Sequence, residues 1–184
     1  MKSIDILVNE HKNIKRVLIV IRKMALLLFK GEKVEIDDFK KIIDFIRNYA
    51  DKHHHGKEED ILFDEMGKKL EGFVAEGPLT AMFSEHDLAR LFVSKIEENL
   101  SEAKEGKDKA IINVISNSIA YADLLNRHIE KEDDTIYVYG KNKLDKESLE
   151  MVEKRILEVE KTAKEKNIQN KYIELIENLE EKYL

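Results

Sequence analysis

Two histidine–glutamate pairs in the sequence have a spacing that suits metal binding. His54 stands four residues before Glu58, and His128 stands four residues before Glu132. Because positions i and i+4 lie on one face of an α-helix, each pair can offer an imidazole nitrogen and a carboxylate oxygen to a common centre. A single pair of this kind is more often a surface ion pair, so the prediction depends on the other histidines of the chain.

Two further histidines follow glutamates, in Glu10-His11 and Glu85-His86. Together with the two pairs they give four histidines and two carboxylates. Imidazole nitrogens and carboxylate oxygens suit iron, and carboxylates that span two ions offset the charge of the ions in a buried site. The pattern therefore indicates a pair of iron ions, and we expect metal binding by His11, His54, Glu58, His86, His128 and Glu132.

Four amphipathic helices are expected to position these side chains. Apolar residues recur at helical spacing in residues 3–31, 37–66, 78–106 and 109–132. Gly31 and Gly106 predict the ends of the first and third helices, and Gly67 and Gly72 suggest where the second helix frays. Each predicted helix contains one of the four histidines.

Capping residues predict where the helices begin. Ser3 is the expected N-cap of the first helix, and Asp37 or Asp38 that of the second. Pro78 suits the first position of the third helix. The fourth helix is expected to end within 136–140.

Short connections force neighbouring helices to be antiparallel. The sequence therefore predicts an all-α fold, an antiparallel up-down-up-down four-helix bundle over residues 1–140 with a charged C-terminal helical extension over residues 141–184. Apolar residues at helical spacing in the extension favour a helical hairpin that covers one face of the bundle. The alternative is an element that joins two copies of the chain in a homodimer.

The composition excludes several kinds of function. The 184 residues include no cysteine, which rules out disulfides, thiolate metal sites and cysteine nucleophiles and fits a reducing cytoplasm. The 32 basic and 38 acidic residues are mixed, so no basic stripe points to nucleic acid. No apolar run reaches the roughly 20 residues needed to span a bilayer, so we expect no membrane partner.

Four strings in the first 140 residues resemble the hemerythrin-like family, also called the HHE cation-binding family. They are Glu10-His11, HHHGKEEDILF over 53–63, SEHD over 84–87 and LNRHIEKE over 125–132. The resemblance implies a non-haem site with two iron ions joined by an oxo or hydroxo bridge. It also implies terminal ligation by four histidines and bridging by two carboxylates, namely His11, His54, His86, His128, Glu58 and Glu132.

The chain departs from the oxygen-carrying hemerythrins at one point. Those proteins present two histidines one turn apart on the third helix, whereas Met82 and Arg90 flank His86 here. The remaining set is similar to the branch of the family that serves in iron or redox sensing, nitric-oxide responses or the repair of iron–sulfur clusters.

Some assignments have alternatives in the sequence. Because successive residues of an α-helix are rotated by about 100 degrees, one histidine of the run 53–55 is expected to face inward. We choose His54 with Glu58, and the competing register is His55 with Glu59. Solvated charges are the simplest interpretation of Glu10, Glu59 and Glu85, although one of them could accept a hydrogen bond from a ligand imidazole. Tyr121 is expected to be a core residue.

Three hypotheses about function follow, and whether the chain is an enzyme is left open. The first is a di-iron protein that binds or reacts with dioxygen, nitric oxide or peroxide in sensing, redox stress response or iron handling, with an external reductant if it is redox-active. The second is an iron-dependent regulatory or interaction module in which the metal is mainly structural and residues 141–184 present a partner surface. A metal-free structural bundle is the third, remoter reading.

Overall fold

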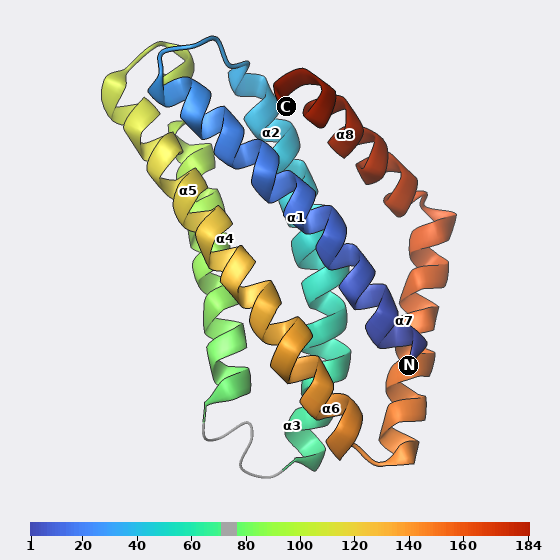
Figure 1. The fold of residues 1–184 in the computed structure, drawn as a ribbon. Helices are drawn as coiled ribbons and strands as arrows, with labels where there is room; N and C mark the ends of the chain where they lie inside the picture. The colour runs from blue at the N-terminus through green and yellow to red at the C-terminus, as the bar shows by residue number, and fades with distance from the viewer. Residues whose placement is uncertain (71–76) are drawn as a thin grey trace.

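The computed structural model describes residues 1–70 and 77–184, and these residues are all helical or in short connections, with no strand among them. Four long helical segments lie side by side (Figure 1). Their elements are α1 (Lys2–Phe29); α2 (Ile36–Phe45), η1 (Ile46–His55), η2 (Glu58–Phe63) and α3 (Asp64–Lys69); α4 (Pro78–Lys104); and α5 (Asp108–Lys131), η3 (Glu132–Ile136) and α6 (Tyr137–Lys143).

Three stretches of these segments, η1, η2 and η3, are π-helical, with hydrogen bonds from residue i to i+5. The apolar spacing of the sequence had predicted α-helix there. Such stretches are rare and are frequently found at functional sites. In this chain all three contain residues that were predicted to bind metal.

Several predicted helix ends agree with the structure. Gly31 and Gly106 follow the ends of α1 and α4 with φ angles of +70° and +82°, a left-handed conformation that glycine adopts without steric cost. Pro78 begins α4, where its missing N–H costs no hydrogen bond.

Both predicted N-caps are wrong. The first helix already begins at Lys2, and Ser3 instead donates hydrogen bonds from its backbone N–H and its hydroxyl to Glu153, in the C-terminal extension, at 3.3 and 3.2 Å. The second begins at Ile36, so Asp37 and Asp38 lie in its first turn, where carboxylates favour the positive end of the helix dipole.

The fourth segment does not end within 136–140 as predicted, because α6 continues to Lys143. Gly140 lies in that helix and allows a close approach, since a Cβ atom there would be 2.8 Å from Sδ of Met66. In the second segment Gly67 lies within α3, which ends at Lys69. Gly72 lies outside the described residues.

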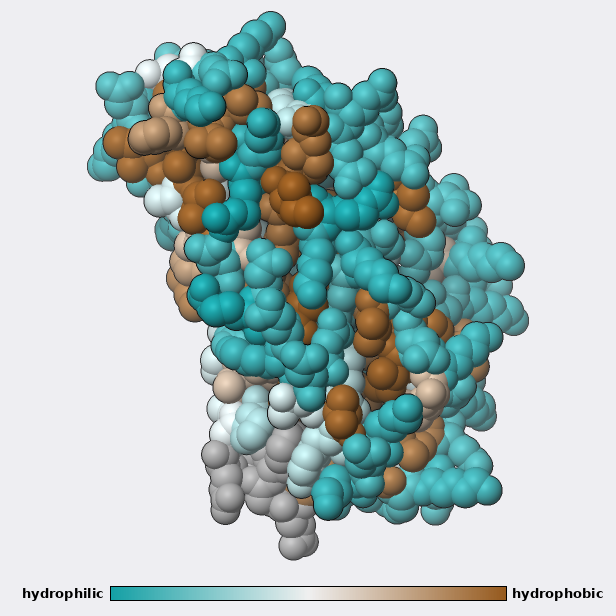
Figure 2. Space-filling model, in the orientation of Figure 1, coloured by the Kyte–Doolittle hydropathy of each residue, from teal (hydrophilic) through white to brown (hydrophobic). Residues whose placement is uncertain are grey.

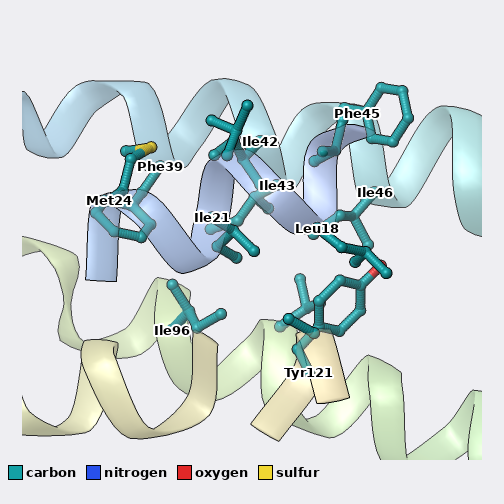
Figure 3. Packing of buried hydrophobic residues seen from close by; sticks show 14 of the residues in the cluster. Leu18, Ile21, Met24, Phe39, Ile42, Ile43, Phe45, Ile46, Ile96 and Tyr121 are labelled. Atoms are coloured by element: carbon teal, nitrogen blue, oxygen red, sulfur yellow. The ribbon is translucent and has the colours of Figure 1, made fainter. Parts of the chain in front are cut away.

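The apolar core forms two clusters that are separated along the four segments. Figure 3 shows the first, in which Leu18 and Ile21 of α1 pack with residues of α2, Ile96 of α4 and Tyr121 of α5. The second lies towards the other end and includes Leu7, Leu62 and Met82. On the first three segments the residues that were predicted to bind metal lie in sequence between the two clusters, and on the fourth His128 and Glu132 lie on either side of Ile129, the last residue of the first cluster there. These residues form a polar layer within the core.

The C-terminal residues form α7 (Lys146–Glu165) and α8 (Ile168–Tyr183), which lie along α1 (Figure 1). Asp145 caps α7 by accepting a hydrogen bond from the backbone N–H of Ser148 at 2.8 Å. Val152 and Ile156 belong to the second core cluster, and the apolar residues of α8 belong to the first. The extension therefore buries its apolar face against the chain's own helices.

The face seen in Figure 2 is largely hydrophilic, with scattered apolar patches. None of the described helices combines the length and the apolar character that crossing a membrane requires.

Candidate metal centre

All six predicted ligands converge in the polar layer of the core, in two adjoining groups. In each group the potential ligand atoms lie within 4.8 Å of one another. Every one of these side chains is buried. The first group consists of His11, His54, Glu58 and Glu132. The second group consists of His55, His86 and His128.

The two carboxylates link the groups. Nε2 of His86 lies 3.8 Å from an oxygen of Glu58 and 3.8 Å from an oxygen of Glu132. Nε2 of His128 lies 3.0 Å from Glu132, and Nε2 of His11 lies 3.3 Å from the other oxygen of Glu132. The two carboxylates can therefore contact ions held by either group.

The expectation that one histidine of the run 53–55 faces inward is wrong, because all three are buried. His54 and His55 both belong to the two groups, and the ring of His55 stacks on that of His86 with centroids 3.8 Å apart. These residues end the π-helical stretch η1. A π-turn is wider than an α-turn, so consecutive residues are rotated by less than the 100 degrees or so assumed for an α-helix.

The two registers considered for this run contribute in different ways. Nε2 of His54 lies 3.6 Å from Glu58, as the chosen register requires. Glu59 does not pair with His55. It accepts a hydrogen bond from Nδ1 of His86 at 2.6 Å instead.

Each of the five imidazoles has a carboxylate at its outward nitrogen. In each case Nδ1 of the imidazole donates a hydrogen bond to the carboxylate. The pairs are His11 with Asp133 at 2.8 Å, His54 with Glu10 at 2.8 Å, His55 with Asp51 at 3.4 Å, His86 with Glu59 at 2.6 Å and His128 with Glu85 at 2.9 Å. Such bonds fix the ring orientation and the tautomer that leaves Nε2 free for a metal. The simplest interpretation of the sequence was that Glu10, Glu59 and Glu85 are solvated charges, but each of them accepts a hydrogen bond from one of these imidazoles.

Cations lie outside four of these five carboxylates. Arg90 donates to Asp51 at 2.6 Å and to Glu59 at 2.8 Å. Lys131 bonds to Glu85, and Lys57 bonds to Glu10. The centre is therefore layered, with imidazoles inside, then carboxylates, then cations.

The electrostatics of the inner carboxylates favour a bound cation. Burial and the neighbouring Glu132 raise the pKa of Glu58 well above its usual range. Burial would raise the pKa of Glu132 too, but the imidazoles of His128 and His11 outweigh it and hold this pKa well below its usual range. A metal ion between the two carboxylates would remove the cost of placing two negative charges together.

The imidazoles differ in protonation. Burial lowers the pKa of His54 to about 4 and that of His55 to about 3, so both rings are neutral near pH 7, as a metal ligand must be. Burial acts in the same direction on His11, but the hydrogen bond to Asp133 and the carboxylate of Glu132 3.3 Å away outweigh it and raise the pKa of His11 to about 9. A metal ion would have to displace that proton.

Several inward polar atoms lack a hydrogen-bond partner among the described residues. They are Nε2 of His54, Oε2 of Glu58 and both carboxylate oxygens of Glu132, and all are buried. Buried polar atoms are nearly always satisfied, and each exception calls for an explanation. Metal coordination would satisfy these atoms, and the imidazole and carboxylate donors match what iron prefers.

A tyrosine that the sequence analysis passed over lies against the centre. The hydroxyl of Tyr137 donates a hydrogen bond to Oε1 of Glu58 and lies 3.4 Å from Nε2 of His11. Its ring stacks on that of His11 at 5.6 Å with an interplanar angle of 5°. Tyr121 is buried in the core as expected, and it lines a small cavity with His55 and His86.

Comparison with known protein families gives a match over most of the chain. The family model described as the hemerythrin HHE cation binding domain matches residues 2–139. No curated protein and no solved structure matches the chain. The match covers all seven residues of the two groups and leaves α7 and α8 outside. Since it spans most of the chain, the protein belongs to the hemerythrin HHE cation-binding family.

Proposed function

We propose that this protein is a non-haem di-iron protein. In this proposal His11 and His54 bind one iron ion, and His55, His86 and His128 bind the other. Glu58 and Glu132 bridge the two ions, together with an oxo or hydroxo group. The four long segments are proposed to form an antiparallel up-down-up-down bundle around the centre, and residues 1–140 to be its metal-binding domain.

The observation that supports this proposal most strongly is the set of unpaired polar atoms at the middle of the core. Nε2 of His54, Oε2 of Glu58 and both oxygens of Glu132 lack a hydrogen-bond partner among the described residues, and the nearest group to Nε2 of His86 is Nε2 of His128 at 2.8 Å, while the outward nitrogen of each imidazole of the two groups is held by a carboxylate. This arrangement is costly without a cation and is the one that orients metal-binding histidines. Bound iron would supply redox and ligand-binding chemistry.

A small cavity beside the second group favours a small ligand. It has a volume of about 90 Å³ and is lined by His55, His86, Asp51, Arg90 and Tyr121, among other residues. An apolar cavity of about 150 Å³ holds a molecule the size of benzene, so this smaller space suits dioxygen, nitric oxide or peroxide better than most organic substrates. We propose that the protein binds or reacts with such a ligand in sensing, redox stress response or iron handling, with an external reductant if it is redox-active.

His55 bears on the choice among these ligands. The third long segment has no second histidine beside His86, but the stacked ring of His55 places a third imidazole in the same group. The number of histidines therefore gives no reason to exclude oxygen binding. The choice depends on the reactivity of the iron-loaded protein.

A second candidate function is an iron-dependent regulatory module in which the metal is mainly structural. The packing of α7 and α8 against the same core as the centre favours it, because metal binding could then alter a surface formed by the extension. A homodimer through residues 141–184 remains a prediction. It would have to use the outward face of the extension, since the apolar face is buried.

The first experiment is metal analysis of protein expressed with ample iron, together with its visible absorption spectrum. We expect about two irons per chain and oxo-bridge charge-transfer bands that change on reduction and on exposure to dioxygen or nitric oxide. Stoichiometric iron without any spectral response to these ligands would favour the structural role. A chain without stoichiometric iron, and with unchanged stability after His54→Ala, would refute the proposal.

A further inference from the structure

A buried lysine joins the metal centre to the C-terminal extension. The ammonium group of Lys57 is fully inside the protein, with 1% of the residue exposed. It bonds to a carboxylate oxygen of Glu10 and to one of Glu160, which lies on α7, and it lies 3.2 Å from Nε2 of His53. Glu10, His53 and Glu160 could by themselves hold a metal ion, but the Lys57 ammonium already lies among them.

Glu10 connects this cluster to the metal centre. One of its oxygens accepts the hydrogen bond from Nδ1 of His54 at 2.8 Å, and the other bonds to Lys57 and lies 2.9 Å from Nε2 of His53. The side chain is buried, so these neighbours, together with Gln169 of the extension, orient it. Any shift of Lys57 therefore changes the position and the charge balance of the carboxylate behind His54.

The extension supplies the rest of the cluster. Besides Glu160, α8 contributes Gln169, whose amide nitrogen lies 3.3 Å from Glu10, 3.3 Å from His53 and 3.4 Å from Glu160. The amide oxygen of Gln169 accepts a hydrogen bond from the hydroxyl of Tyr49 at 3.0 Å. Both helices of the extension thus contact the group that holds His54.

The other cations outside the carboxylates of the centre do not depend on the extension in this way. The side chains of Arg90 and Lys131 are 38% and 48% exposed, so water can compensate for a lost partner. Only 1% of Lys57 is exposed, and a buried ammonium is costly unless carboxylates offset it. Glu160 is therefore needed to keep Lys57 in place beside Glu10.

We propose that the extension is a working part of the metal centre, in which Glu160 acts through Lys57 and Glu10 as a positioning residue for the ligand His54. The inference rests on the proposed di-iron site and adds to it a part of the chain that the family match does not cover. In this arrangement, undocking of α7 would weaken iron binding and alter the redox behaviour of the centre without touching a metal ligand.

The test uses the full-length chain with Glu160→Gln and, as the matched control, Glu158→Gln, the same change at an exposed site on the same helix. Iron affinity is measured by competition with a chelator, and the reduction midpoint by spectroscopic titration. Loss of a partner that supports a ligand typically weakens metal binding by about 10–100-fold, and we expect about tenfold for Glu160→Gln. Because a negative charge is lost, the midpoint should shift to a more positive potential.

A double-variant comparison separates this coupling from a general loss of stability. If Glu160 acts through Lys57, the change Glu160→Gln should have little further effect on iron affinity in a Lys57→Met background. Equal and independent effects in both backgrounds would contradict the coupling. Thermal unfolding of each iron-free variant identifies those that fold.

The outcomes distinguish the two proposals. If the wild-type protein binds about two irons and the folded Glu160→Gln and Glu158→Gln variants match it in affinity and midpoint, the inference is wrong and the di-iron site stands. If the wild-type protein binds no iron, the di-iron site fails and the inference fails with it.

Discussion

Tyr137→Phe should lower the stability of the iron-free protein by removing one hydroxyl group. That hydroxyl bonds to Oε1 of Glu58, which is fully buried and has few alternatives. Leaving a buried acceptor without its donor costs about 1–3 kcal/mol. For a chain of this length each kcal/mol shifts the melting temperature by about 2–4 °C, so the expected decrease is about 2–12 °C.

The matched control is Tyr121→Phe. Tyr121 is also 1% exposed, but within the described part of the chain its hydroxyl has no hydrogen bond, so the same change should have little effect on stability. Thermal unfolding followed by circular dichroism measures both variants without iron and with it. Bound iron should reduce the difference, because the metal then compensates Glu58. Equal melting temperatures for the two iron-free variants would show that the Tyr137–Glu58 bond does not stabilise the core.

Three further predictions concern other parts of the molecule. His55→Ala should weaken binding of one of the two proposed irons by more than about 100-fold, measured by metal analysis after dialysis against a chelator; two retained irons would exclude His55 as a ligand. Gly140→Ala should destabilise the protein by about 1–3 kcal/mol, because the new Cβ atom would meet the side chain of Met66. Gly56 lies in a helical turn with open space around it, so Gly56→Ala should stabilise the protein by about 0.4–1 kcal/mol. Denaturant unfolding measures both changes. Burial raises the pKa of Asp38, but hydrogen bonds from Lys182, Lys41 and Tyr183 outweigh it and lower this pKa below its usual 3.8. The stabilising effect of the Asp38 carboxylate should therefore be full above about pH 4 and be lost at lower pH, and Asp38→Asn should reduce that pH dependence of the free energy of unfolding.

The periodic features of the chain were predictable from sequence. The spacing of His54 with Glu58 and of His128 with Glu132 placed both pairs in one site, because residues four apart share a face in an α-helix and nearly do so in a π-helix. The all-helical fold followed from apolar periodicity in the same way. The spacing of residues within one helix is enough to predict both features.

The features that the sequence did not reveal depend on distant contacts. Glu10 resembles a surface carboxylate in sequence, and its burial follows from Lys57, which in turn is offset by Glu160 about 100 residues later. Tyr137 was assigned to a helix exit and not to the centre, because the continuation of the helix into α6 was not foreseen. The run of three histidines was the available signal for His55, but an α-helical geometry was assumed there.

The π-helical stretches have a consequence for how the centre can change. A π-turn holds one residue more than an α-turn, so the helix faces before and after it remain in phase while one additional side chain enters the interior. Loss of a single residue near Lys52, an exposed position in η1, would narrow this wide turn to an α-turn and rotate one histidine of the run 53–55 away from the interior, without changing the phase of the apolar residues at either end. The ligand set can therefore evolve by deletion while the core of the protein is preserved.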